Sequence, residues 1–425
     1  MPGESLATSD TTALRNTLAK RPVSVNQMRT VKVPDKRALA PESAPTPTRL
    51  LSPLFVLVTL STFAYFTSVG ALQPTLPRFV EGPLGGGRVA VGLSVGVFSI
   101  AAVFMRPFGG YLSDIHGRRI TIVLGAATVA AAILCQIWVE SLAWLVPLRV
   151  VSGVGEALFW VGAAAAVSDL APENRQGEAV SYFSLALYGG LVLGPVLGET
   201  ILGQDSYGNV WLLAAGLAGL AALLGIAVGD TRPDDGTNSV SGWRRFVHPG
   251  AFLPGTVLAT SMLGLGGFFT FVPLYALELG MSGSKLVFAL FSGIVLVIRS
   301  LGARLPDRLG SLKSARGALS GQAAGLTIAA LWQTPTGLLV GTVVYALGQS
   351  LAFPALMTMA VGRARASERG AVVGTFSAFF DFGFGLGAVV LGAVAGTMGY
   401  AGSFLVGAGV ALGGLVLLSV RADSI

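Results

Sequence analysis

The stretch RPFGGYLSDIHG at residues 106–117 has a second copy, RSLGARLPDRLG, at residues 299–310. Both copies begin with an arginine, carry an aspartate at the ninth position and end with a glycine, and they are offset by 193 residues. The same offset pairs glycines further along the chain, namely Gly155 with Gly348, Gly190 with Gly383 and Gly194 with Gly387. One offset over so much of the chain indicates two copies of one structural unit.

The composition indicates a protein that lies in a membrane. Of the 425 residues, 53% are hydrophobic and 12% are charged, and the mean hydropathy is +0.72. A soluble protein carries roughly 25% charged residues. A membrane-spanning helix needs about 20 mostly apolar residues. Twelve such stretches occur, at 53–77, 89–112, 120–139, 142–168, 178–201, 210–229, 250–276, 284–306, 315–333, 336–361, 369–395 and 398–419.

The longest hydrophilic gap between these stretches, residues 230–249, lies midway. We therefore predict an all-α membrane protein with 12 transmembrane helices in two pseudo-symmetric six-helix halves, residues 52–229 and 250–421, joined by a cytoplasmic linker at 230–249. Residues 1–51 are basic and rich in Pro, Ser and Thr, which predicts a disordered cytoplasmic tail. Repeated halves in an apolar chain are typical of secondary transporters, whose substrate site lies between the halves.

The distribution of Lys and Arg predicts the orientation. With the N-terminus inside, the later cytoplasmic segments hold fourteen basic residues and the outer loops hold three, and such an excess marks the cytoplasmic side. We predict a multi-pass protein of the inner or plasma membrane with both termini cytoplasmic. The net charge of +7 therefore reflects membrane orientation, and we expect no nucleic-acid partner.

The sequence argues against a cofactor. Cys135 is the only cysteine, and the two histidines, His116 and His248, lie in hydrophilic loops, so we expect no metal site. No phosphate-binding loop of the G-x-x-x-x-G-K-[ST] type occurs, which excludes ATP as the energy source. Without a nucleophile–base constellation or a cofactor loop, we predict that the protein is not an enzyme.

Charged residues inside predicted helices cost about 2.5–3.5 kcal/mol each, so they usually face a cavity or a partner. Arg149 and Glu156 share one helix face, and a buried carboxyl of this kind suits a proton carrier. Asp381 has Arg106 as a partner if their helices meet across the halves. We predict proton coupling by Glu156, Arg149, Asp381 and Arg106. The alternatives are a static ion pair and a carboxyl that only bonds a neighbouring helix.

The repeated motif itself predicts a gate. Arg106, Gly110 and Asp114 lie on one helix face, and Arg299 and Asp307 repeat the pattern in the second half. A carboxylate there can bind the positive N-terminus of a helix from the other half and so close the cytoplasmic side. The alternative is a fixed loop contact that takes no part in opening and closing.

Two motifs resemble those of the major facilitator superfamily, from about residue 52 to 420. GYLSDIHGRR at 110–119 matches the family's G-x-L-x-D-x-x-G-R-R, and RVVSGVGEA at 149–157 matches its R-x-x-x-G-x-G-x-A, whose arginine the family links to proton coupling. The resemblance implies a cytoplasmic gate formed by Gly110, Asp114, Gly117, Arg118 and Arg119, with Arg299, Asp307 and Gly310 in a second copy that departs from the motif.

A third motif resembles the antiporter signature G-x-x-x-G-P-x-x-G-G of drug–proton exporters. It is GLVLGPVLGE at 190–199, in which Gly190, Gly194, Pro195 and Gly198 match and Glu199 replaces the last glycine. Physically, the small residues permit close helix packing and the proline bends the helix. The alternative reading is a packing kink without a coupling role.

We therefore predict a proton-coupled antiporter that exports small amphipathic compounds, such as drugs or secondary metabolites, by alternating access. Its expected partners are a small-molecule substrate, protons as the coupling ion and the lipid bilayer, and we expect it to function as a monomer. One alternative is a carrier of sugars or other metabolites, as exporter or symporter. Another is a membrane receptor or assembly partner that has lost the transport cycle.

Overall fold

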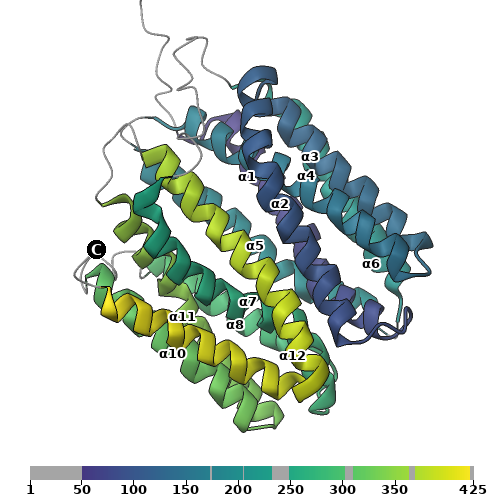
Figure 1. Ribbon diagram of the computed structural model, residues 1–425. Helices are drawn as coiled ribbons and strands as arrows, with labels where there is room; N and C mark the ends of the chain where they lie inside the picture. Colours follow the sequence, from purple (N-terminus) through teal and green to yellow (C-terminus); the bar gives the residue numbers. More distant parts are fainter. Residues whose placement is uncertain are drawn as a thin grey trace, which may run out of the picture. The chain divides into compact units, whose positions relative to one another are not determined.

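A computed structural model describes residues 50–172, 175–203, 205–231, 248–301, 310–362 and 369–421. These residues are almost entirely helical (Figure 1), and none of them forms a β-strand. The α-helices are α1 (Pro53–Glu81), α2 (Arg88–His116), α3 (Arg118–Cys135), α4 (Leu142–Leu170), α5 (Gln176–Leu202), α6 (Tyr207–Val228), α7 (Phe252–Glu278), α8 (Lys285–Leu301), α10 (Ser311–Leu331), α11 (Pro335–Val361) and α12 (Arg369–Val420). Two short 3₁₀ helices, η2 (Gln136–Trp138) and η5 (Pro249–Ala251), follow α3 and precede α7.

Some predictions fall on other parts of the chain. The tail at 1–51 and the linker at 230–249 lie almost wholly outside the described residues, and so does Asp307 of the second gate motif.

Local sequence signals fix where helices begin. Ser52 accepts a hydrogen bond from the backbone N–H of Phe55 at 3.2 Å, and Pro53 occupies the first turn of α1. Thr334 does the same for Gly337 at the start of α11, which also begins with a proline. Both are the combination expected at a helix N-terminus, where backbone donors lack partners within the helix.

Nine of the described helices are long and apolar enough to cross a membrane. Two of the twelve predicted stretches fall short of that description. The described part of α8 has 17 residues, and α10 begins with SLKSAR, whose Lys313 and Arg316 lower its hydropathy. Two further stretches, 369–395 and 398–419, share the label α12, and they are two helices that meet at a kink at Gly399, whose φ of 75° and ψ of 177° are not helical (Figure 1).

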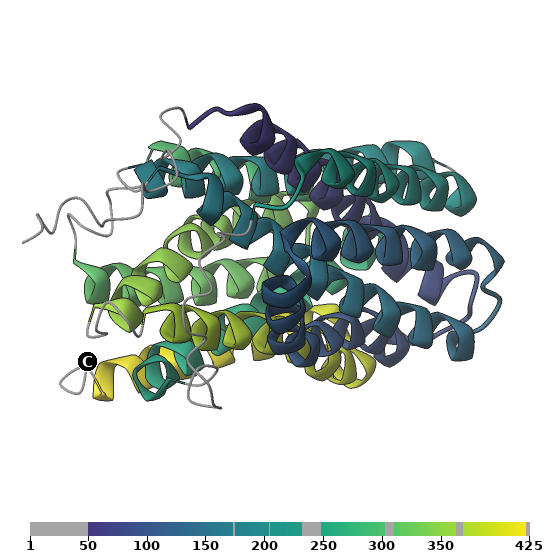
Figure 2. The same ribbon diagram turned by 90° about the horizontal axis from the view of Figure 1, so that it is seen from above.

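The helices pack as two equivalent sets (Figures 1 and 2). In the first half α1 lies against α5 and α6, α2 against α4, and α3 against α4 and α6. In the second half α7 lies against α12, α8 against α11, and α10 against α11 and α12. Each contact of one half thus has its counterpart in the other, and the predicted fold of two pseudo-symmetric six-helix halves is confirmed.

Two pairs of helices make most of the contact between the halves: α2 with α12 and α5 with α8. Glycines let α2 and α12 approach closely. A methyl group on Gly92 would overlap the carbonyl oxygen of Ala388, and one on Gly96 would lie 2.5 Å from that of Gly385. We call this contact the α2–α12 seam. Small residues at such contacts are the usual means by which membrane helices come together.

The antiporter-like motif on α5 also serves close packing. Gly190, Gly194 and Gly198 lie against the backbone of α1, and a methyl group on Gly194 would lie 2.5 Å from the Thr67 carbonyl oxygen. The second half has the same packing: Gly387, which lies 193 residues after Gly194, contacts Leu263 of α7. The motif therefore has a structural role in this fold, whichever way transport is coupled.

Candidate functional site

A buried cluster of three charges joins the two halves across the α2–α12 seam. Arg106 of α2 places its Nη1 atom 2.9 Å from Oδ2 of Asp381 on α12. Its Nη2 atom lies 3.4 Å from Oε1 of Glu156 on α4. Glu156 and Asp381 are each only 8% exposed. The pairing of Arg106 with Asp381 that the sequence suggested is therefore present, and Glu156 shares the same guanidinium.

The cluster is not electrically balanced when both acids are ionised. One guanidinium then faces two carboxylates, which leaves one negative charge in a low-dielectric interior, where an uncompensated charge is costly. Oε2 of Glu156 and Nε of Arg106 are buried without a hydrogen-bond partner among the described residues. The cluster thus has capacity to take up a proton.

The equivalent position in the second half is neutral. Gln349, which lies 193 residues after Glu156, accepts a hydrogen bond at 2.7 Å from Nε2 of Gln322. The same Nε2 atom lies 2.8 Å from the hydroxyl of Ser261. This buried amide network is uncharged, so only the first half has an acid at this position.

Arg149, the fourth residue predicted to couple protons, lies apart from the cluster. Its Nε donates to the carbonyl oxygen of Ser94 at 3.0 Å, and its guanidinium lies 4.6 Å from the ring centre of Phe98. Arg149 and Glu156 share a helix face, as predicted, but each bonds to a different part of α2. The structure therefore brings together three of the four residues.

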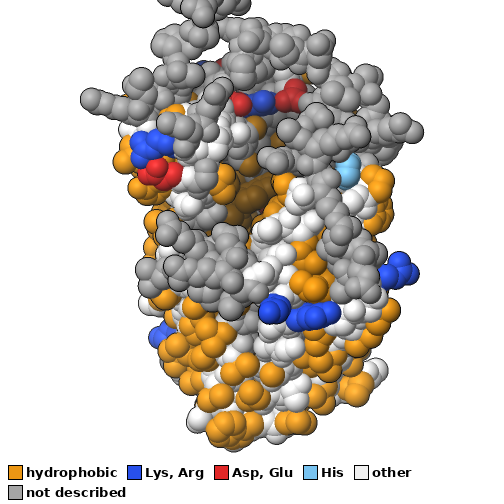
Figure 3. Space-filling view, turned by 90° about the vertical axis from the view of Figure 1, so that its left-hand side faces the viewer, with side chains coloured by type: hydrophobic (Ala, Val, Ile, Leu, Met, Phe, Trp, Pro, Cys, Tyr) orange, Lys and Arg blue, Asp and Glu red, His pale blue; other side chains and the backbone are white. Residues whose placement is uncertain are grey.

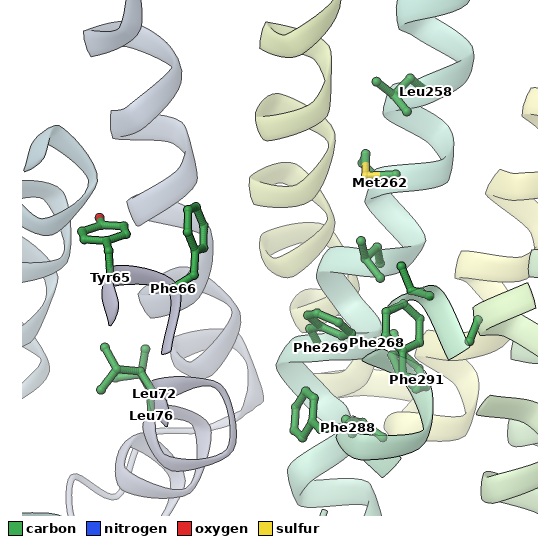
Figure 4. Packing of buried hydrophobic residues seen from close by; sticks show 14 of the residues in the cluster. Tyr65, Phe66, Leu72, Leu76, Leu258, Met262, Phe268, Phe269, Phe288 and Phe291 are labelled. Atoms are coloured by element: carbon green, nitrogen blue, oxygen red, sulfur yellow. The ribbon is translucent and has the colours of Figure 1, made fainter. Parts of the chain in front are cut away.

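Arg149 faces a cavity of about 90 Å³ between the halves. Its wall is mainly apolar, with Gln73, Arg149 and Ser152 as the polar members. The other lining residues are Val69, Leu72, Leu76, Pro77, Val95, Phe98, Val129, Ile133, Phe269 and Phe384. Figure 4 shows Leu72 and Leu76 on α1 across from Phe269 on α7. The halves thus both contribute to the wall, as a substrate site between repeats requires.

The first gate motif forms a network around Arg118 at the start of α3. Arg118 binds Asp114 at 2.6 Å and Asp169 of α4 at 3.0 Å, and its backbone N–H donates to Asp230 at 3.2 Å. Gly117 has a φ of 96°, and a methyl group there would overlap the Asp230 carboxylate. These contacts join α2, α3, α4 and the start of the linker.

The remaining gate residues are placed as follows. Arg119 is exposed, and Gly110 has open space around it. Arg299 of α8 lies 4.4 Å from the ring centre of Tyr188 on α5, which is a contact between the halves. Gly310 has a φ of 84°, close to that of its counterpart Gly117, so the repeat is reproduced in the backbone conformation.

At the opposite end of the bundle, two sets of contacts join the halves. Glu199, at the end of α5, accepts a hydrogen bond from the backbone N–H of Ser284 at 2.7 Å, directly before α8, and lies 3.7 Å from Arg78. Arg88 of α2 lies 3.5 Å from Glu278 of α7 and donates to the carbonyl oxygen of Ala395 at 2.9 Å. We call these contacts the Glu199 and Arg88 latches.

The end where α12 terminates is the face drawn in Figure 3. Figure 3 shows a hollow on this face, with hydrophobic side chains in its depth. The two ends therefore differ: one carries the two latches, and the other carries this hollow.

The sequence alone predicts no role for Arg88, and it shows Glu199 as an acid inside a predicted helix that departs from the antiporter signature. This departure could have indicated the contact of Glu199 with the start of α8, because a carboxylate is stabilised by the N-terminus of a helix. The Arg88 latch has no such signal, since a single arginine in a loop predicts nothing about its contacts.

Comparison with known proteins identifies the family. The sequence model of the Major Facilitator Superfamily matches residues 58–335 and 284–424. An uncharacterized MFS-type transporter of Salmonella typhimurium is 28% identical over 377 residues, which cover 85% of this chain and 94% of that protein. One of Burkholderia mallei is 27% identical over 390 residues, covering 89% and 95%.

Solved structures agree on the fold. A POT family transporter in complex with a thioalcohol-conjugated peptide has a TM-score of 0.74 at 14% identity, covering 87% of this chain and 96% of that one. The human organic anion transporter MFSD10 has a TM-score of 0.67 at 18% identity, covering 86% and 98%. From the family match and these relatives, the chain belongs to the Major Facilitator Superfamily and is a secondary transporter, not an enzyme, that crosses the membrane several times.

Proposed function

We propose that this transporter is a proton-coupled antiporter of the inner or plasma membrane that exports small amphipathic compounds, such as drugs or secondary metabolites, and that it works as a monomer with protons as its coupling ion. The observation that carries the proposal is the sharing of Arg106 by Glu156 and Asp381. Because one positive charge faces two acids, uptake of a single proton makes this cluster neutral.

The position of the cluster supports coupling of protonation to movement. Arg106 and Glu156 belong to the first half and Asp381 to the second, so the attraction between Arg106 and Asp381 holds the halves together at this depth. Protonation of Asp381 removes that attraction, and Glu156 keeps Arg106 neutralised. The halves are then free to rock about the substrate site, which is the movement that alternating access requires.

The predicted orientation, with both termini cytoplasmic, assigns each end of the bundle to one side of the membrane. The hollow beside the end of α12 then faces the cytoplasm, and the Glu199 and Arg88 latches close the outer side. The structure would represent the state that accepts a compound from inside.

The cavity wall favours an amphipathic substrate over a sugar. Three of its lining residues are polar, and the others are aliphatic, proline or aromatic. A sugar needs many hydrogen-bonding partners, because each hydroxyl that leaves water without one is costly. The apolar wall suits a compound with an apolar body and one polar group.

We expect Glu156→Gln and Asp381→Asn each to slow the exchange of protons for substrate strongly. Each change keeps the shape of the side chain but removes the site that takes up the proton. The measurement uses proteoliposomes with an imposed pH gradient and a pH-sensitive dye inside, to which amphipathic cations, anions, neutral drugs and sugars are added. A compound that discharges the gradient through the wild type should lose at least about tenfold of that rate in either variant, since one catalytic proton-transfer group contributes about 10²–10⁴-fold.

The matched control is Glu140→Gln, which neutralises an exposed acid beyond η2 and should leave the rate unchanged. Wild-type rates in both cluster variants would remove the cluster from the mechanism. If labelled compounds cross but none moves protons, the metabolite-carrier alternative takes the place of the antiporter.

We expect Glu199→Ala to open the outer side. The variant loses the carboxylate that binds the N-terminus of α8, an interaction worth up to about 2 kcal/mol in a partly buried setting. Spin labels at Glu140 and Gln333, which are exposed in loops of different halves, report the separation of that end in a Cys135→Ser background. The population with the longer distance should rise about five- to thirtyfold, corresponding to about 1–2 kcal/mol.

Glu178→Ala is the control for that measurement. Glu178 is also a glutamate of α5, but it lies at the other end of the helix and pairs with Arg175 of the same half at 2.7 Å. Its loss should leave the distance distribution unchanged. An unchanged distribution in Glu199→Ala as well would show that the Glu199 latch does not hold the halves together.

A further inference from the structure

Tyr65 of α1 places a buried hydroxyl beside the charge cluster. The residue is 0% exposed, and its hydroxyl has no hydrogen-bond partner among the described residues. Its ring stacks on that of Phe159, with the ring centres 3.9 Å apart. Phe159 lies three residues after Glu156, so the two share one face of α4. Figure 4 shows the hydroxyl of Tyr65 pointing away from Leu72 and Leu76, which line the cavity.

The surroundings of Tyr65 distinguish the two acids of the cluster. Three charged groups lie close enough to the phenol to interact with it, and they are Glu156, Arg149 and Arg106, of which Glu156 has the largest effect. Asp381 is not among them. Tyr65 can therefore act on one of the two carboxyl groups and not on the other.

Three buried polar atoms at this place lack hydrogen-bond partners among the described residues, and they complement one another. They are the hydroxyl of Tyr65, Nε of Arg106 and Oε2 of Glu156. The phenol and the guanidinium can donate, and the carboxylate oxygen accepts. A buried water typically makes about three hydrogen bonds, so one water can accept from both donors and donate to the carboxylate.

Asp381 has weaker support for its negative charge. Its Oδ2 atom lies 2.9 Å from Nη1 of Arg106 but makes no hydrogen bond among the described residues. Glu156, in contrast, accepts a hydrogen bond from Nη2 of the same arginine. Hydrogen bonds to a carboxylate favour its ionised form. A further hydrogen bond to Glu156 therefore directs a proton to Asp381.

We propose that Tyr65 determines which acid of the cluster takes up the proton. Its O–H donates to a buried water that donates in turn to ionised Glu156, and the incoming proton forms an O–H bond on Asp381. The phenol keeps its own proton throughout. Tyr65 is thus a positioning residue that acts through Glu156.

This inference rests on the proposed function and adds a requirement to it. Only a proton on Asp381 removes the attraction between Arg106 and Asp381 that joins the halves. A proton on Glu156 would neutralise the cluster equally well but would leave that attraction in place. The choice between the two acids therefore decides whether protonation can release the halves.

Infrared spectroscopy identifies the acid that holds the proton, and it needs no substrate. The full chain in lipid bilayers is taken from alkaline to acidic pH, and the C=O stretching band of a protonated carboxyl is recorded. The band of the cluster is the one absent from Asp381→Asn, in which a single acid balances Arg106. Carbon-13 in the side-chain carboxyl of either aspartate or glutamate then shows which residue type carries the proton. We expect the aspartate label to shift this band in the wild type.

Tyr65→Phe removes only the hydroxyl and keeps the ring that stacks on Phe159. The ratio of protonated aspartate to protonated glutamate in the cluster should fall at least about tenfold, because a hydrogen bond to a charged group contributes that much. The glutamate label should then shift the band. A wild-type band that shifts with the glutamate label, or a Tyr65→Phe band that still shifts only with the aspartate label, overturns the proposal.

Tyr345→Phe is the matched control. Tyr345 of α11 is 1% exposed, and its hydroxyl also lacks a hydrogen-bond partner among the described residues. No charged group among those residues interacts with it. The variant should keep the proton on aspartate. A shift of the proton to glutamate in Tyr345→Phe as well would mean that loss of any buried hydroxyl has this effect, which also overturns the proposal.

The outcomes distinguish this inference from the proposed function. If the proton moves to glutamate in Tyr65→Phe but no compound moves protons in the proteoliposomes, the role of Tyr65 stands and proton antiport fails. If a compound discharges the pH gradient in a manner that depends on Asp381, while Tyr65→Phe keeps its proton on aspartate, proton antiport stands and the role of Tyr65 fails. The absence of any cluster band overturns both, since the cluster then takes up no proton.

Discussion

Replacement of Arg106 by glutamine is expected to lower the stability of the folded protein by about 3–5 kcal/mol, the usual cost of removing one partner from a buried ion pair. The variant leaves Glu156 and Asp381 facing each other without a positive charge, both nearly inaccessible to water. The fraction of monodisperse protein that remains after heating in detergent, followed over a range of temperatures, measures the loss. Transport should be lost together with the folded protein.

The charges themselves can be tested by neutralising the whole cluster. In the triple variant Arg106→Gln, Glu156→Gln, Asp381→Asn no uncompensated charge remains, so most of the stability should return while proton exchange stays absent. Arg175→Gln serves as the control, because it removes an arginine from an exposed pair with Glu178, and such pairs contribute little. A triple variant as unstable as Arg106→Gln would mean that the arginine acts through packing rather than charge.

Gly387→Ala and Gly194→Ala are each expected to lower stability by at least about 2 kcal/mol, because overpacking of a filled interior costs about 1–3 kcal/mol and the contact here is rigid backbone. The new methyl group on residue 387 would overlap the carbonyl oxygen of Leu263, and the one on residue 194 would lie 2.5 Å from that of Thr67. Thermal unfolding of the purified protein in detergent gives the comparison.

Gly413→Ala, in the helix of α12 that follows Gly399, is the matched control. Nothing lies within 4 Å of a methyl group there, so the change should be neutral or slightly stabilising, since alanine favours a helix over glycine by about 0.5–1 kcal/mol. If all three variants unfold at the wild-type temperature, the helices are not packed as closely as the structure places them. Equal losses at 194 and 387 would mean that the antiporter-like signature has a packing function common to both halves.

The sequence predicted the fold well because two independent signals coincide. Apolar stretches of about 20 residues show where helices lie, and the 193-residue repeat shows that they form two equivalent sets. Details that depend on a single residue were not predictable. The two apolar stretches of α12 predict its two helices, but they give no indication that the chain turns between them at one residue, Gly399, with a positive φ.

The site was predictable in part, for a related reason. The cost of a buried charge identifies Arg106, Glu156 and Asp381 from the sequence, because each lies within an apolar stretch and must find a partner. The cost does not identify the partner. Arg149 shares a helix face with Glu156, yet the two side chains bond to different parts of α2, since a shared face fixes direction along one helix and says nothing about the neighbouring helix.

The glycines of the α2–α12 seam have a mechanical consequence. Because Gly92 and Gly96 carry no side chains, α2 can tilt against α12 without any interlocked rotamers having to change. The strong contacts of α2 with the second half then lie at Arg88 and Arg106, which are eighteen residues and therefore about 27 Å apart. We expect α2 to pivot at these glycines. Protonation of the cluster at Arg106 would then change the strength of the contacts that Arg88 makes at the other end of α2.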